Sequence, residues 1–199
     1  MARKLESLPH LILASASPRR SELLSRLPLS FTVVPSDAPE VHDEQLTARE
    51  ICLVNAYRKA RVVSKQHPDE LVLGADTLVT LETRLFGKPS DLKDAQRMLR
   101  ELQGKTHEVI TGVCLMHLRS HTVKTFVETT WVTFKRLSAE EIRRYVTKAK
   151  TLDKAGAYGI QEFGEMLVDR VDGSFNNVVG LPTESLQRAL RDWPVMETA

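Results

Sequence analysis

The feature that most constrains the fold is an apolar run from Leu71 to Val79, which carries a single acidic residue, Asp76. A run this continuous predicts a central β-strand covered on both faces, because a strand with one solvated face alternates apolar and polar residues. An ionised carboxylate in such a strand needs a cation, a metal ion or several N–H donors, since burying an unpaired charge is very costly. Gly74 has no side chain and lets a ligand or another backbone segment come close. Asp76 is therefore either a functional carboxylate or an aspartate that caps a turn at the end of the strand.

A second informative stretch runs from Leu11 to Arg20 and predicts a short strand, a serine-bearing turn and a helix. Ser17 is expected to cap this helix, with Pro18 at its first position, where the missing N–H costs nothing. Arg19 and Arg20 occupy the first turn, although the helix dipole disfavours cations there. Hydroxyl groups, backbone N–H groups and two guanidinium groups at one helix start suit a phosphate chain. The alternative is that both arginines are solvated surface charges.

Local signals place most of the other elements. Capping boxes, in which Ser or Thr is followed three residues later by Glu, predict helices from Thr47 to about Ser64 and from Ser138 to about Ala149. A further helix is expected from its cap Asp91 to Gly104. The remaining expectations are strands over residues 31–35, 107–118 and 122–134, a loop, a short strand and a turn over 173–182, and a closing helix over 183–192.

Two other polar residues lie among small neighbours. Lys59 shares a helix face with Asn55 and Ala56, and it either extends to water past them or is held over a cleft. Gln161 follows Gly156 and Gly159, which indicate tight turns or a backbone pressed against a ligand. A glutamine side chain offers one acceptor and two donors, which suit the edge of a nucleobase. The alternative is a surface glutamine on a glycine-rich loop.

Composition disfavours several classes of protein. The formal net charge of +2 over 199 residues is too small for binding nucleic acid or a membrane surface by bulk attraction, so any anion site must be local. No stretch approaches the roughly 18 apolar residues of a transmembrane helix. Cys52 and Cys114 form no metal-binding pattern, so we expect buried thiols in a reducing compartment, by default the cytoplasm. The sequence also lacks a P-loop, GxGxxG, HExxH and a nucleophile elbow.

Several short motifs together resemble the Maf (septum-formation protein) family of nucleoside triphosphate pyrophosphatases. In chain order, the motifs are Ser15-Ala16-Ser17-Pro18-Arg19-Arg20, Lys59-Ala60, Gly74-Ala75-Asp76-Thr77, Lys88-Pro89, Thr111-Gly112-Val113, residues 153–161 and residues 178–182. The resemblance implies an α/β fold with a mixed sheet and flanking helices, in which residues 1–199 form one domain of two lobes with a central cleft. This fold is related in kind to that of inosine triphosphate pyrophosphatases, and a homodimer is common in the family. The resemblance also implies release of pyrophosphate from a nucleoside triphosphate, with Mg²⁺ or Mn²⁺ as the cofactor.

The same motifs imply the site residues by position. The family's active-site carboxylate, a proton acceptor, falls on Asp76, and its acidic partner falls on Glu40, with Asp37 as the alternative. Asp76 and Glu40 are the expected metal ligands, and Asp76 acts either as a general base or only as a ligand. The phosphate-handling residues fall on Ser15, Arg19, Arg20, Lys59 and Lys88, and the positions linked with substrate choice fall on Arg19, Thr77 and Gln161.

The segment Ala155–Gln161 resembles the branch of the family that acts on TTP and UTP, rather than the branch that acts on 7-methyl-GTP. Glu162 and Phe163 depart from the small residues that often follow this glutamine. The sequence therefore predicts an enzyme in which water attacks the α-phosphorus while basic side chains hold the departing pyrophosphate. The competing hypothesis is a nucleotide-binding regulator of cell division with little catalysis. A nucleic-acid-binding module is disfavoured, because no basic stripe is interleaved with aromatic residues.

Overall fold

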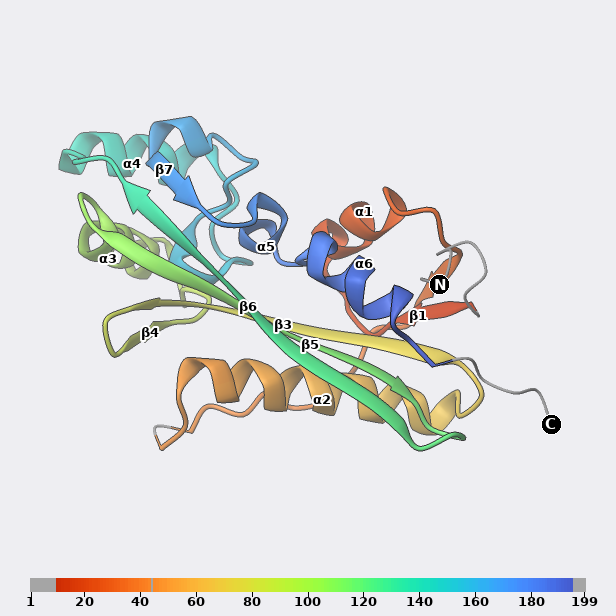
Figure 1. The fold of residues 1–199 in the computed structure, drawn as a ribbon. Coiled ribbons are helices and arrows are strands. Elements are labelled where there is room, and N and C mark those ends of the chain that lie inside the picture. The colour runs from red at the N-terminus through yellow and green to blue at the C-terminus, as the bar shows by residue number, and fades with distance from the viewer. Residues whose placement is uncertain (1–9, 44, 195–199) are drawn as a thin grey trace. The chain divides into compact units, whose positions relative to one another are not determined.

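A computed structural model describes residues 10–43 and 45–194 (Figure 1). Over these residues the chain forms a seven-stranded mixed sheet of order β2-β1-β3-β5-β6-β7, with β4 paired to β3. The strands are β1 (Leu11–Leu13), β2 (Phe31–Val33), β3 (Leu71–Leu81), β4 (Arg84–Phe86), β5 (Thr106–His117), β6 (Thr122–Phe134) and β7 (Val168–Asp172). The helices are α1 (Pro18–Ser25), α2 (Ala48–Gln66), α3 (Leu92–Leu102), α4 (Ala139–Lys148), α5 (Phe175–Val179) and α6 (Thr183–Arg191), with the short 3₁₀ helices η2 (Ala155–Ala157) and η3 (Gly164–Met166).

The chain divides into two compact units. The first contains residues up to Asp76, Thr111–Glu128 and the residues from Gly180 onward, and the second contains Thr77–Ile110 and Thr129–Val179. The strands β3, β5 and β6 each contribute residues to both units. The expectation that residues 1–199 form one two-lobed domain stays a prediction.

In the first unit, β1 pairs in parallel with β2 on one side and β3 on the other. Helix α2 lies along β3 and β5 (Figure 1), and two glycines allow its backbone to touch theirs. A Cβ on Gly74 would lie 2.2 Å from the carbonyl oxygen of Ala56, and a Cβ on Gly112 would lie 2.4 Å from that of Cys52. Any side chain at either glycine would therefore displace the helix.

The second unit has its own apolar core. Antiparallel pairing joins β3 to β4 and β6 to β7, and α3 and α4 supply apolar faces. Its large buried side chains include Phe86, Leu99, Phe134 and Tyr145. His107 is buried among them, with its Nε2 2.8 Å from the hydroxyl oxygen of Tyr158 and its ring 4.7 Å from that of Phe134. The histidine therefore belongs to the core of this unit.

The local signals of the sequence are confirmed. Both capping boxes are formed, at Thr47 and Ser138, and Asp91 caps α3. Pro18 opens α1 as expected, although the side chain of Ser17 makes no capping hydrogen bond. The apolar run is a buried central strand, and both cysteines are buried and form no disulfide.

The prediction of a short strand within residues 173–182 is wrong, because residues 175–179 form the helix α5. The Ser174 hydroxyl accepts a hydrogen bond from the backbone N–H of Asn177, as a helix cap does. The Asn177 side chain then donates to the Val109 carbonyl and to the Thr130 hydroxyl. These tertiary contacts override the strand preference of Val178 and Val179. The sequence reading also missed β4 and β7.

Candidate active site

Asp76, Lys59 and Glu40 form an ionic cluster in the first unit. The Lys59 ammonium lies 2.6 Å from Asp76 Oδ1 and 2.7 Å from Glu40 Oε1. Asp76 is 6% exposed, so the expected compensation for its charge is present and comes from a lysine. Strand β3 supplies the aspartate, α2 supplies the lysine, and the segment before α2 supplies the glutamate.

Asn55 fixes the glutamate-bearing segment beside Asp76. Its side-chain nitrogen donates to the Val41 carbonyl and to Asp76 Oδ2, at 3.2 and 3.1 Å, and its side-chain oxygen accepts from the Val41 N–H at 2.7 Å. From the sequence, Asn55 was predicted only to share a helix face with Lys59. Its spacing of four residues from Lys59 on the same helix was the signal that it faces the same site.

The choice between Glu40 and Asp37 follows the same contacts. Glu40 shares Lys59 with Asp76 and is next to Val41, which Asn55 holds. Asp37 is exposed, and it precedes this anchored segment by three residues. The geometry thus favours Glu40 as the partner of Asp76.

The turn after β1 carries the next group of predicted residues. Leu13, at the end of β1, pairs with Leu73 in the parallel strand β3, so Ser15 and Asp76 lie two and three residues beyond this pair in the same direction. The Arg20 guanidinium donates to the Ser15 hydroxyl at 3.3 Å and to the Gly180 carbonyl at 2.9 Å. Arg19 lies beside it in the first turn of α1. An arginine held by these two hydrogen bonds beside a hydroxyl group and a helix start suits an anion, and we call this arrangement the anion cradle.

The charges of these two groups affect one another. Burial lowers the pKa of Arg20, the negative charge of Asp76 raises it, and Arg19 lowers it again. Arginine stays charged at neutral pH despite such shifts. The charge of Arg20 therefore interacts both with the Asp76 carboxylate of the ionic cluster and with the Arg19 cation in its own turn.

The other predicted residues belong to the second unit. Thr77 follows Asp76 in β3, Lys88 is exposed just after β4, and Gln161 is exposed after η2. The backbone N–H of Gly156 donates to the Gly87 carbonyl at 3.1 Å, which joins the glycine-rich segment to the residue before Lys88. Within this unit, Lys88 and the segment that leads to Gln161 are thus held in one assembly.

The first unit has a donor set that fits a magnesium ion. Mg²⁺ in phosphate-processing sites is bound by one or two carboxylates together with water and substrate phosphates. Asp76 and Glu40 offer two such carboxylates around one lysine. Within residues 10–43 and 45–194, no group of three or more His, Cys, Asp or Glu side chains is arranged to hold a metal ion. The cluster therefore fits an ion completed by a phosphate substrate, rather than one enclosed by protein.

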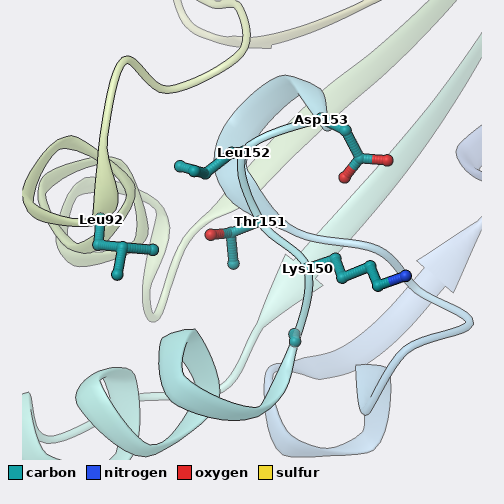
Figure 2. A pocket seen from close by; sticks show the side chains of 6 residues that line it. Leu92, Lys150, Thr151, Leu152 and Asp153 are labelled. Carbon is teal, nitrogen blue, oxygen red and sulfur yellow. The ribbon is translucent and has the colours of Figure 1, made fainter.

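A separate cavity of about 440 Å³ lies in the second unit (Figure 2). It is lined by Leu92, Ala149, Lys150, Thr151, Leu152 and Asp153. None of the predicted site residues lines it, so this cavity is distinct from the ionic cluster.

In the described part of the chain, no helix is long and apolar enough to cross a membrane.

Comparison with known proteins gives concordant matches. A family model described as Maf-like protein matches residues 10–193. A protein of Acetivibrio thermocellus named dTTP/UTP pyrophosphatase is 45% identical over 192 residues, which cover 93% of this chain and 96% of that protein. A protein of the same name from Bacillus cytotoxicus is 46% identical over 182 residues, which cover 92% and 94%.

Among solved structures, a HAM1 protein from Coxiella burnetii aligns with a TM-score of 0.54 at 14% identity, over 94% of this chain and 100% of that one. At this identity the likeness concerns the fold alone. Together with the seven-stranded mixed sheet, it confirms the predicted α/β class.

Proposed function

Because the chain belongs to the family of Maf-like proteins, we propose that it is a pyrophosphatase that hydrolyses TTP and UTP to the nucleoside monophosphate and pyrophosphate. Relatives 45% and 46% identical over more than nine-tenths of the chain carry the name dTTP/UTP pyrophosphatase. The observation that carries the proposal is the ionic cluster of Asp76, Lys59 and Glu40, with the Ser15–Arg20 turn following β1, the parallel neighbour of the strand that supplies Asp76.

In the proposed reaction, water attacks the α-phosphorus and the bond to the oxygen that bridges the α- and β-phosphates breaks. Asp76 accepts the proton of the water, or serves only as a ligand of the metal ion. Lys59 holds the carboxylates of Asp76 and Glu40 in place and presents its positive charge to the phosphates. Pyrophosphate leaves with the bridging oxygen.

The basic side chains act on the leaving group. Ser15 and Arg20 are already joined by a hydrogen bond, so the cradle exists before substrate arrives and needs little reorganisation. Arg19, Arg20 and Lys88 are proposed to neutralise the charge that grows on the pyrophosphate. Positioning and charge neutralisation supply most of the catalysis in reactions of phosphates.

Mg²⁺ or Mn²⁺ is the proposed cofactor, with Asp76 and Glu40 as its protein ligands. When bound, such an ion polarises the phosphate and lowers the pKa of water. Asn55 fixes the orientation of the carboxylates by its hydrogen bonds to Asp76 and to the residue after Glu40. A supporting residue of this kind keeps the ligands in register.

Base selection is proposed to involve Thr77 and Gln161, together with Arg19. A uracil or thymine edge presents one N–H beside carbonyl oxygens, which a glutamine amide can match. Gln161 is exposed and ends a segment of tight turns, so its amide is accessible. Modified pyrimidine triphosphates offer the same edge and are included in the proposed substrate class.

The decisive experiment separates the products of hydrolysis. The full chain is incubated with Mg²⁺ or Mn²⁺ and with UTP, TTP, modified pyrimidine triphosphates or purine triphosphates, and pyrophosphate and orthophosphate are measured separately. The proposal expects the monophosphate and pyrophosphate, with UTP and TTP preferred. Orthophosphate together with a nucleoside diphosphate would refute it, and tight nucleotide binding without any product would support a regulator instead. The names of the relatives favour catalysis.

A homodimer and a cytoplasmic location stay predictions.

A further inference from the structure

We propose that Glu162 is a positioning residue for base selection, which acts by clamping the segment that carries Gln161 to the buried ammonium group of Lys154. This inference rests on the proposed function, because it concerns which triphosphate that reaction accepts. All of its contacts lie within the second unit.

The centre of the clamp is a lysine that is almost completely buried. Lys154 is 4% exposed, and its ammonium nitrogen lies 2.9 Å from Glu162 Oε1 and 2.9 Å from Asp153 Oδ1. The same nitrogen donates to the Lys150 carbonyl. The ammonium group thus donates hydrogen bonds to the Lys150 carbonyl and to Asp153 and forms an ion pair with Glu162.

Glu162 uses both of its carboxylate oxygens. One oxygen receives Lys154, and the other accepts the backbone N–H of Lys150 at 3.1 Å. The residue next to Gln161 is therefore tied at two points to the beginning of the same segment. A carboxylate with two fixed donors restrains the backbone on either side of it more than one contact would.

The stem of Lys154 fills the space beneath the segment. A Cβ on Gly159 would lie 2.6 Å from Lys154 Cε, so a side chain at this position would displace the lysine from its place. The N–H of Gly159 donates to the Tyr145 hydroxyl at 3.1 Å, and the N–H of Glu162 donates to the Gly159 carbonyl at 3.0 Å. The backbone on the N-terminal side of Gln161 is thereby held by the core, and the clamp holds the C-terminal side.

The exposed glutamine is consequently displayed from a restrained backbone. Preorganised polar groups discriminate between ligands better than mobile ones, because no ordering entropy is lost on binding. Phe163, the next residue, is exposed and adopts a left-handed backbone conformation with φ 58°. Glu162 is therefore the residue that ties this exposed turn to the buried ammonium group.

The test is Glu162→Gln in the full chain, with kcat and KM for UTP and ATP measured separately. Glutamine keeps the size of the side chain and removes its charge, and Glu162 is partly exposed, so folding is expected to persist. We expect the ratio of kcat/KM for UTP over ATP to fall about fivefold or more through the KM for UTP, with kcat for ATP unchanged. Glu165→Gln, at an exposed glutamate three residues further on, is the matched control and should keep the wild-type ratio.

The Gln161→Ala background separates positioning from direct contact. If Glu162 acts through Gln161, adding Glu162→Gln to Gln161→Ala leaves the ratio of UTP to ATP unchanged. A further loss of selectivity in that background would overturn the inference, since Glu162 would then contact the base itself. A wild-type ratio in Glu162→Gln, or an equal loss for both triphosphates, would overturn it as well. Failure of the proposed function is a different result, in which the unmodified chain releases no pyrophosphate.

Discussion

Each of the two units contains a lysine between two carboxylates, but the two arrangements differ in how they are built. Lys59 joins Asp76 to Glu40 across three separate elements, and its side chain is 13% exposed. Lys154 joins Asp153 to Glu162, with all its partners inside residues 150–162, and its side chain is 4% exposed. Glu40 keeps 38% of its side chain exposed, so substrate or an ion can approach the first lysine cluster.

The difference teaches how the same ion pair serves two purposes. The carboxylate partners of Lys154 are exposed as well, so the difference lies in the lysines and in the segments that they join. Lys59 joins segments that lie far apart in the chain and can exchange its partners for phosphate and metal, whereas the more deeply buried Lys154 holds one short segment of backbone in one shape. The first should therefore affect turnover more than stability, and the second should do the reverse. The following predictions test this contrast, from the largest expected effect to the smallest.

The largest effect is expected for Asp76→Asn. Asparagine preserves the shape and the acceptor for Lys59 but removes the charge that binds metal and accepts a proton, so kcat should fall by at least about 100-fold, the lower range for losing a general base. Release of pyrophosphate from UTP with Mg²⁺ measures this. Thermal unfolding without metal should be lowered only slightly, because Lys59 loses one ion pair but keeps Glu40 as its partner. Near-wild-type turnover would refute the mechanism, and an unfolded variant would make Asp76 a structural residue.

The second prediction concerns a buried base in the second unit. Burial lowers the pKa of His107 to about 4 from its usual 6.5, so the unfolded chain binds this proton more tightly than the folded one. Stability should therefore be complete above pH 6.5 and fall by up to about 3 kcal/mol as the pH drops toward 4. Denaturant unfolding across this range should show the loss in the wild type and less of it in His107→Gln. The exposed His121, replaced by Asn to suit its positive φ, is the control and should leave the profile unchanged.

Third, Lys154→Met should destabilise the fold by roughly 2–3 kcal/mol, below the range for a fully buried pair because both carboxylates keep contact with water. The lower denaturation midpoint should be accompanied by nearly normal kcat for the protein that remains folded. Lys150→Met, on the same segment with an exposed ammonium (Figure 2), should change stability little. If Lys154→Met and Lys150→Met lowered stability equally, the Lys154 cluster would not have the stabilising role that distinguishes it from the Lys59 cluster.

A smaller effect is expected for Gln161→Ala. Loss of one polar match to a pyrimidine should reduce the selectivity for UTP and TTP over purine triphosphates by roughly 1–3 kcal/mol. Competition assays with mixed triphosphates measure the ratio directly. If the ranking of substrates stays the same, the base is read elsewhere, with Thr77 as the next candidate.

The smallest effect is a thermal shift. Pyrophosphate binds only the folded chain, and at ten times its Kd it should stabilise the protein by about 1.4 kcal/mol. Arg19→Ala should reduce this shift and impair turnover, whereas Arg26→Ala, at the other end of α1, should do neither. If Arg19→Ala retains both properties, that arginine is a solvated surface charge.

The sequence predicted what depends on neighbouring residues. Thr47 with Glu50 and Ser138 with Glu141 set helix starts by contacts three residues apart, and these were read correctly. The apolar run around Asp76 also revealed a buried strand and the need for a cation. Each of these signals is contained within a short window of the chain.

What the sequence did not predict depends on distant contacts. The Asn55 side chain is positioned by hydrogen bonds with Val41 and Asp76, which lie 14 and 21 residues away in the chain. No pattern of neighbouring residues predicts either hydrogen bond. The helix that follows Ser174 is held by contacts of Asn177 with Val109 and Thr130, which lie 68 and 47 residues away. The burial of Lys154 likewise follows from packing against Gly159, which the glycine pattern alone did not indicate.

The backbone contact of α2 with Gly74 and Gly112 has a consequence for engineering. At these two points the backbone of the helix packs directly on the backbone of the strands, with no side chain between them. Substitutions elsewhere in the core are therefore expected to change the distance between Lys59 and Asp76 little. Mutant libraries aimed at new base preferences can therefore vary exposed residues around Gln161 in the second unit, while Asp76, Lys59 and Glu40 are kept as an unchanged module. The two glycines themselves should be left out of such libraries, because any larger residue would shift the module as a whole.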